Sequence, residues 1–176
     1  KTWPESEKGK MKVSGFELKA ANAAPITKQV QDIAFNLIGT GASEDEVNSA
    51  IRPIVNSLRD GTVSVEDIAT FGRIKKAFHQ YTSVVPMAVR AAKYYNDNMQ
   101  PDEPFRPGDG AQWIYISSTP ETLPNQVEFS KRKPMWAEVV AFRDPSEIED
   151  FDIDYETITE KMIHKKLESV YSTMEW

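Results

Sequence analysis

The chain has 176 residues, of which 40% are hydrophobic, and a formal net charge of −6. This length suits one compact domain or two small lobes that share a core, and it excludes a large multidomain enzyme. The chain has no cysteine, which excludes disulfide bonds and thiolate metal sites and is typical of a reducing cytoplasm. No stretch approaches the run of about eighteen apolar residues that a membrane span needs, so no membrane association is expected.

The first predicted element is a strand over residues 10–19. Basic or polar residues alternate there with apolar ones, which is the period of a half-buried strand. Gly15 interrupts the alternation and indicates a bulge or a close approach of the backbone. We expect this segment to enter the domain as a strand.

Two amphipathic helices follow. Pro25 suits a first helical turn, and apolar residues continue at helical spacing as far as Gly39. Ser43 and Glu46 then form a capping-box pattern, and the second helix ends at Asp60-Gly61. Pro53 lies inside this second helix and predicts a kink or a late restart of the helix near Arg52.

The middle of the chain is less regular. Residues 64–67 predict a further short helix, whereas residues 71–83 combine helical spacing with a glycine and β-branched residues and stay ambiguous. Pro86 opens a helix that extends to about Asn98. The proline-rich residues 100–109 predict a loop.

Two strands and a helix are predicted for the last third. Residues 113–116 and 136–142 are rich in aromatic and β-branched residues and are expected to pair. The polar connection between them contains Lys131-Arg132-Lys133 and is too long for a tight turn, which predicts an excursion from the sheet. A helix from Tyr155 to about Met174 closes the chain, and Ile158, Met162, Ile163, Leu167 and Val170 form its core stripe.

Charge is unevenly distributed along the chain. Between Ile68 and Asn96 there is no acidic residue, although five basic residues fall inside, whereas residues 144–160 carry eight acids and no base. This asymmetry indicates one face for an anionic partner, in spite of the negative net charge. A solvated basic face explains the same residues, and composition alone favours that simpler interpretation.

No residue pattern indicates catalysis or metal binding. His79 and His164 are far apart and lack a carboxylate at ligand spacing. The acids Asp152 and Asp154 are interpreted as carboxylates at a helix N-terminus, where the helix dipole favours them, rather than as a cation site. Gly39-Thr40-Gly41 follows a helix and lacks a lysine, so it is a helix terminator and not a phosphate loop.

Four segments in collinear order resemble one known family. They are Gly15-Phe16-Glu17-Leu18 with residues 24–28, residues 81–96, residues 105–109 before the strand at 113–116, and residues 152–156 opening the last helix. Together they are similar to the C-terminal thumb of family B DNA polymerases of archaeal or tailed-phage type. Residues 81–96 resemble a turn and a helix that contains Arg-Ala-Ala and ends in Tyr-Asn.

The resemblance implies a fold and a division of the chain. The fold is α+β, a mostly helical thumb domain with one strand entering from the palm side and a small β hairpin. Within residues 1–176 it places the palm-proximal strand in 1–24, a helical DNA-gripping lobe in 25–100, a strand pair with loops in 101–150 and the C-terminal helix in 151–176.

The resemblance also implies a function without catalytic residues in this chain. The thumb would grip the primer–template duplex through its backbone, and the expected DNA contacts are Lys28, Lys75, Lys76, Tyr81, Thr82, Ser83, Arg90 and Lys93. The expected contacts with the palm are Val13, Gly15, Phe16 and Glu17. The metal-binding aspartate motifs of the palm are absent from the sequence, so Mg²⁺ is expected in a palm- and exonuclease-containing partner chain.

Two departures from the family pattern alter these expectations. Ala20-Ala21-Asn22 stand where the family often has an Arg and an Asp, and Val84-Val85 replace a flexible glycine before Pro86. The expected setting is the cytoplasm of an archaeal cell or a virus-infected host cell, in a polymerase encoded as two chains or in one domain of a longer chain. A sliding clamp reached through the partner chain is a further expected partner. An alternative function is a small assembly domain whose acidic face binds a basic partner.

Overall fold

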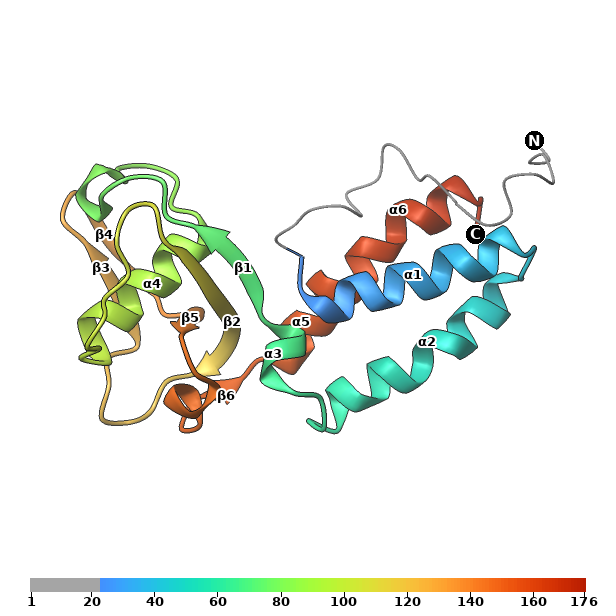
Figure 1. The fold of residues 1–176 in the computed structure, drawn as a ribbon, viewed down its shortest axis with the longest axis horizontal. Coiled ribbons are helices and arrows are strands. Elements are labelled where there is room, and N and C mark those ends of the chain that lie inside the picture. Colours follow the sequence, from blue (N-terminus) through green and yellow to red (C-terminus); the bar gives the residue numbers. More distant parts are fainter. Residues whose placement is uncertain (1–22) are drawn as a thin grey trace.

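The computed structural model describes residues 23–176, which form two lobes lying end to end in an elongated molecule (Figure 1). One lobe is helical, and the other is built on a small antiparallel sheet. Helix makes up 47% of the described residues and strand 18%, which confirms the predicted α+β class. The strand predicted over residues 10–19 lies outside the described residues.

The helical lobe is formed by α1 (Pro25–Gly39), α2 (Glu44–Arg59) and the last helix of the chain. Along α1, Ile26, Val30 and Ala34 are four residues apart, so they lie on one face and are buried together. α1 packs on both α2 and the last helix, which closes the core of this lobe. Both predicted helices are confirmed.

The start of α2 follows the predicted capping box. The Ser43 hydroxyl accepts from the Glu46 amide at 3.3 Å, and the Glu46 carboxylate accepts from the Ser43 amide at 3.1 Å. The helix is continuous from Glu44 to Arg59, so it does not restart near Arg52. Pro53 is exposed, and water can therefore bond the carbonyl that loses its partner at the proline.

The sheet lobe begins where α3 (Val65–Ile68) leads into β1 (Thr70–Arg73). β2 (Gly110–Ser118) pairs antiparallel with β1, with β5 (Val139–Phe142) and, near its end, with the short β6 (Asp152–Ile153). α4 (Met87–Asn98) packs against β1, β2 and β5. The predicted helix after Pro86 and the pairing of the two predicted strands are confirmed.

The ambiguous segment 71–83 resolves into a strand end and a 3-10 turn at Phe78–Gln80. β1 comes very close to α4 here, since a Cβ added at Gly72 would lie 2.4 Å from the Ala88 Cβ. Gly72 therefore sets the distance between the sheet and α4.

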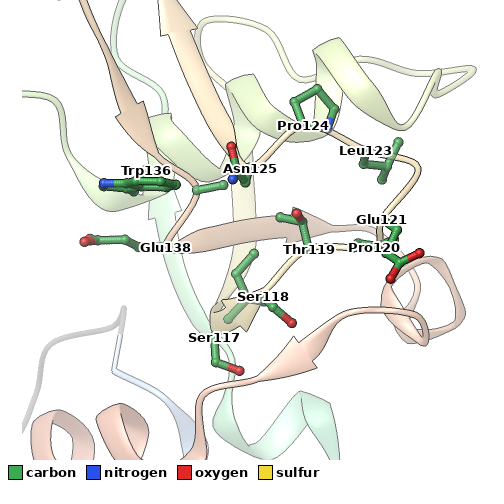
Figure 2. Close-up of a pocket in the computed structure, with 12 residues that line it drawn as sticks. Ser117, Ser118, Thr119, Pro120, Glu121, Leu123, Pro124, Asn125, Trp136 and Glu138 are labelled. Carbon is green, nitrogen blue, oxygen red and sulfur yellow. The ribbon is translucent and has the colours of Figure 1, made fainter.

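The connection between the two predicted strands contains a hairpin of its own. β3 (Gln126–Phe129) pairs antiparallel with β4 (Arg132–Trp136), and the open end of this hairpin borders a hollow on the surface (Figure 2). The single strand predicted over 136–142 is divided, because Glu138 donates its amide to the Trp136 carbonyl at 3.0 Å and turns the chain between β4 and β5.

The last helix joins the two lobes. It runs through α5 (Tyr155–Ile158), a π-helical stretch (Thr159–His164) and α6 (Lys165–Thr173), as predicted from Tyr155 to about Met174. The Asp154 carboxylate caps it by accepting from the Thr157 amide at 3.0 Å, which is the predicted role of an acid at this position. The Thr27 hydroxyl of α1 donates to the Met162 carbonyl at 2.8 Å.

Candidate nucleic-acid interface

The tip of the β3–β4 hairpin is held against the segment that precedes α4. Phe129 at the end of β3 packs edge-on against Phe78, with ring centroids 6.5 Å apart. The Arg132 guanidinium, at the start of β4, donates from Nη1 to the Ser83 carbonyl. These contacts join two segments that are far apart in the sequence.

Five basic residues lie on the two segments that meet at this junction, and we call them the basic tip: Lys75, Lys76, Lys131, Arg132 and Lys133. The four lysines of the basic tip are exposed. Arg132 is half-buried, and its guanidinium bonds the turn before α4. The nearest acidic residue along the hairpin is Glu128. Because several like charges lie on two segments that contact each other, the basic tip is suited to a polyanion.

Residues 81–84 differ in how exposed their side chains are, so they contribute to the basic tip in different ways. Tyr81 is only 5% exposed, and the Lys76 ammonium lies 4.7 Å from the centre of its ring. Tyr81 thus positions Lys76, because a cation over an aromatic face is attracted to it. Thr82 and Ser83 are exposed, and Val84 is 82% exposed at the apex of the turn.

Arg90 lies in the first turns of α4 and is half-buried. Its Nε donates to the Val85 carbonyl at 2.9 Å, which ties the side chain back to the turn before the helix. No carboxylate pairs with Arg90 within residues 23–176. Its charge is therefore not neutralised by an ion pair there and stays close to the turn that carries Ser83.

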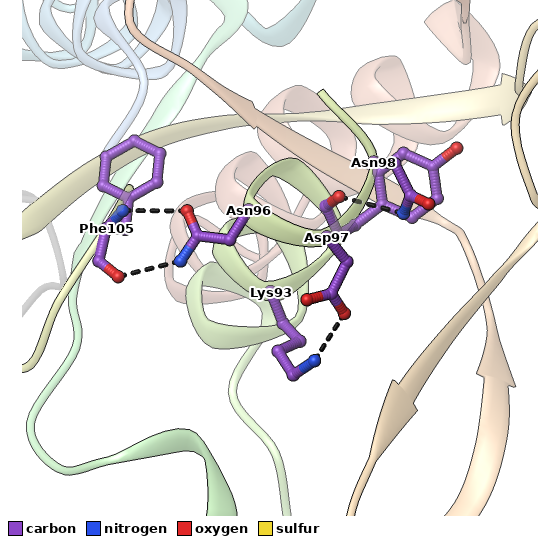
Figure 3. Close-up of polar contacts among 6 residues, drawn as sticks. Lys93, Asn96, Asp97, Asn98 and Phe105 are labelled. Atoms are coloured by element: carbon purple, nitrogen blue, oxygen red, sulfur yellow. Dashed lines mark hydrogen bonds and ion pairs between the residues drawn. The ribbon is translucent and has the colours of Figure 1, made fainter. Parts of the chain in front are cut away.

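Lys93, one turn further along α4, is engaged by Asp97 in an ion pair (Figure 3). Figure 3 also shows how Asn96 holds the proline-rich loop: its side chain accepts from the Phe105 amide and donates to the Phe105 carbonyl, both at 2.8 Å. The Asp97 charge offsets that of Lys93, so Lys93 offers less to an anion than Arg90 does.

The remaining predicted contacts are not gathered at the basic tip. Lys28 is exposed in the first turn of α1, in the helical lobe, whereas the basic tip belongs to the sheet lobe. The predicted palm contacts Val13, Gly15, Phe16 and Glu17 lie outside the described residues.

The far side of α4 is anchored by a buried tyrosine. The Tyr95 hydroxyl donates to the Glu147 carboxylate. Burial, together with this hydrogen bond, raises the pKa of Tyr95 to about 12. Burial alone would raise the pKa of Glu147, but hydrogen bonds from Tyr95 and from the amides of Asp144 and Arg143 outweigh it and hold that pKa below its usual value. This bond ties α4 to the 3-10 turn at Pro145–Ile148.

The contribution of the β3–β4 hairpin to the basic tip was not predicted from the sequence. Lys131, Arg132 and Lys133 stood out only as a basic run inside a polar connection. The pattern of β3, in which Val127 and Phe129 are buried and alternate with exposed residues, was the signal that would have revealed a hairpin.

The described residues offer no set of three or more acidic or histidine side chains placed to hold a metal ion. His164 faces Glu160 one turn earlier on the same helix, at 3.3 Å. No helix within residues 23–176 is both long and apolar enough to cross a bilayer.

Comparison with known proteins finds a likeness in structure but none in sequence. No known family and no curated protein sequence matches the chain. Among solved structures, the chain is similar to the family B DNA polymerase from the hyperthermophilic archaeon Pyrobaculum calidifontis, with a TM-score of 0.56 at 15% identity over 83% of this chain. The chain spans 17% of that polymerase.

The fold of this chain thus occurs within a family B DNA polymerase. At this level of identity the likeness concerns the fold, and it agrees with the family whose motifs the sequence resembles.

Proposed function

We propose that this chain is a non-catalytic part of a family B DNA polymerase, the thumb, which grips the primer–template duplex by its sugar-phosphate backbone. The observation that carries the proposal is the basic tip, where the Arg132 bond to the Ser83 carbonyl joins the hairpin cations to the segment before α4. The likeness in fold to a family B polymerase supports the same assignment.

The chemistry of the basic tip fits phosphate rather than base edges. Lysine and arginine side chains on a projecting turn neutralise phosphates and release counterions, which gives affinity without sequence preference. The exposed hydroxyls of Thr82 and Ser83 add neutral donors at the same turn. A grip of this kind lengthens the stay of a polymerase on DNA at any sequence.

The chemical step belongs to a partner in this proposal. Two-metal phosphoryl transfer needs carboxylates that hold two Mg²⁺ ions. A palm- and exonuclease-containing chain would supply these carboxylates, and the segment around Val13 to Glu17 would dock on it. A clamp would be reached through that chain.

The test is duplex binding as a function of salt. Lys75→Gln and Lys133→Gln each remove an exposed charge of the basic tip, and fluorescence anisotropy with a labelled primer–template reports the affinity. Each lost phosphate contact should flatten the slope of log K against log salt by about 0.9. Affinity should fall about equally for unrelated duplex sequences.

Lys165→Gln is the matched control, because Lys165 is an exposed lysine of α6 in the other lobe. It should leave the affinity and the salt slope unchanged. Equal effects of all three substitutions would show that DNA binding depends only on the net charge of the chain, and would contradict a defined interface. A second measurement is primer extension by the matching palm-containing chain, which should rise when this chain is added.

A further inference from the structure

The open end of the β3–β4 hairpin borders a hollow of about 660 Å³ on the surface of the sheet lobe (Figure 2). The hollow is lined by Ile116 of β2, by the connection that follows β2 as far as Asn125, and by the bridge from Trp136 to Glu138. In liquid this volume corresponds to about twenty water molecules. The hollow therefore has room for several residues of a ligand rather than for a single small ion.

The walls of the hollow are held in place by hydrogen bonds to buried elements. The hydroxyl of Tyr94, a fully buried residue of α4, donates to the Pro124 carbonyl at 2.7 Å. The Ala137 amide donates to the Asn125 carbonyl at 2.9 Å, and the Ile116 amide donates to the Glu138 carbonyl at 3.0 Å. Because both sides are tied down, the hollow is formed before any ligand arrives.

The lining combines an exposed indole with carboxylates. Trp136 is 65% exposed, whereas Trp113 in the same lobe is 6% exposed. Glu121 and Glu138 lie in the lining, which contains no lysine, arginine or histidine. In Figure 2 the Trp136 and Glu138 side chains project to the same side of the hollow.

This combination selects a cation that has an aliphatic stem. The face of tryptophan attracts ammonium and guanidinium groups more strongly than the face of any other aromatic side chain does. The two carboxylates add charge complementarity, while Leu123 and Ile116 offer apolar surface for methylene groups. A lysine or arginine side chain has both parts.

A nucleic acid fits the hollow poorly, although an exposed tryptophan can stack on a base. Glu121 and Glu138 would face the phosphates that accompany any base and would repel them. The cations of the hairpin lie at its other end, because Arg132 and Trp136 begin and end β4, about 13 Å apart at about 3.3 Å per residue. The hairpin thus carries positive charge at its turn and an acidic hollow at its open end.

We propose that this hollow is a docking site for a basic segment of a partner protein. Trp136 holds a lysine or arginine side chain of that segment together with Glu138, which lies on the same side of the hollow, and Glu121, on the opposite side, pairs with a second basic side chain (Figure 2). The site is separate from the basic tip, so it stands whether or not the chain grips DNA.

The experiment titrates the isotope-labelled 176-residue chain with an acetylated nonapeptide that carries lysine at alternate positions, followed by NMR. The indole N–H signal of Trp136, assigned with Trp136→Phe, should shift and saturate, while that of Trp113 should stay in place. The same peptide with glutamate in place of lysine should cause no shift. Trp136→Ala should abolish the binding.

Conservative charge variants keep the test independent of folding. Glu121→Gln and Glu138→Gln alter exposed side chains, and each should weaken peptide binding about two- to fivefold. Glu128→Gln is the matched control, since Glu128 is an exposed acid of the same hairpin outside the hollow, and it should bind like the unmodified chain.

Three results would overturn the proposal. One is a Trp136 signal that does not move with the lysine peptide, or that moves equally in Glu121→Gln and Glu138→Gln. Another is a larger shift with a twelve-residue oligothymidylate, which would make the hollow a nucleic-acid site. The last is binding of spermidine as tightly as the peptide, which would make it a small-amine site. Duplex affinity measured on the same variants reports separately on the basic tip.

Discussion

Substituting Gly72 by alanine probes the close contact between β1 and α4. The added Cβ would lie 2.4 Å from the Ala88 Cβ, whereas carbon atoms in contact are about 3.5–4.0 Å apart. One element must therefore move by roughly 1 Å, and overpacking of this kind destabilises a protein by about 1–3 kcal/mol. Replacing a strand glycine by alanine also stabilises the folded chain by up to about 1 kcal/mol, because alanine loses less backbone entropy on folding. We expect a net loss of about 1–2 kcal/mol in the free energy of unfolding.

The same geometry predicts a rescue by Ala88→Gly. Without the Ala88 methyl, the nearest atoms to the new Cβ are Trp113 Nε1 at 3.7 Å and Ala88 Cα at 3.9 Å, which are ordinary contacts. Ala88→Gly alone should destabilise the chain by about 1 kcal/mol, because glycine disfavours helix. In its presence Gly72→Ala should be neutral or stabilising, which gives a coupling free energy of about 1–3 kcal/mol.

Urea unfolding of the four proteins, followed by far-UV circular dichroism, measures this coupling. Gly41→Ala is the control: Gly41 has φ +85° and open space around it, so its loss of about 1 kcal/mol comes from the backbone. That loss should be the same with Ala88 or Gly at position 88. Equal destabilisation by Gly72→Ala in both backgrounds would refute the contact between β1 and α4.

Other expected outcomes concern the hairpin, the last helix and pH. Arg132→Lys keeps the charge but loses the planar guanidinium that bonds the turn before α4, so duplex affinity in anisotropy titrations should fall while the salt slope hardly changes. Thr27→Val removes the donor to the Met162 carbonyl, and urea unfolding should show a loss of about 1–2 kcal/mol that Thr27→Ser largely restores. Because the pKa of Glu147 is held below its usual 4.5, its contribution to stability is complete above that pH and is lost as pH falls through the folded-state value, a loss that Glu147→Gln should reduce. Because the pKa of Tyr95 is raised from 10.0 to about 12, its contribution is present below pH 10 and should fade as pH rises toward 12, which Tyr95→Phe should prevent.

Local signals in the sequence were sufficient to predict most of the helices. The capping box at Ser43, the proline at the start of α1 and the proline before α4 each act within one turn of the chain, so neighbouring residues reveal them. The pairing of β2 with β5 was also predictable, because both strands are rich in aromatic and β-branched residues.

The hairpin and the assembly of the basic tip depend on contacts that sequence spacing does not reveal. β4 contains Pro134, which argues against a strand unless the strand lies at an edge. Arg132 meets Ser83 across 49 positions of the chain, and no periodicity reports such a contact. The opposite charge of the hairpin ends became apparent only once β3 and β4 were paired.

The helix restart predicted at Pro53 does not occur. A proline inside a helix removes one hydrogen bond, but the start of α2 is stabilised by the Ser43–Glu46 box and its inner face by Val47, Ile51 and Leu58. Packing of that face on α1 outweighs the lost bond, so the helix continues through the proline.

The path of the chain makes the sheet lobe an insertion into the helical lobe. The chain leaves the helices through α3 and returns to them through α5, so the helical core needs residues from both ends of the described sequence. Two backbone crossings resist twisting better than one does, and the Lys161 ammonium, 4.9 Å from the Tyr115 ring, braces the joint. Because the lobes share two chain connections and this contact, we expect them to unfold together in one cooperative transition.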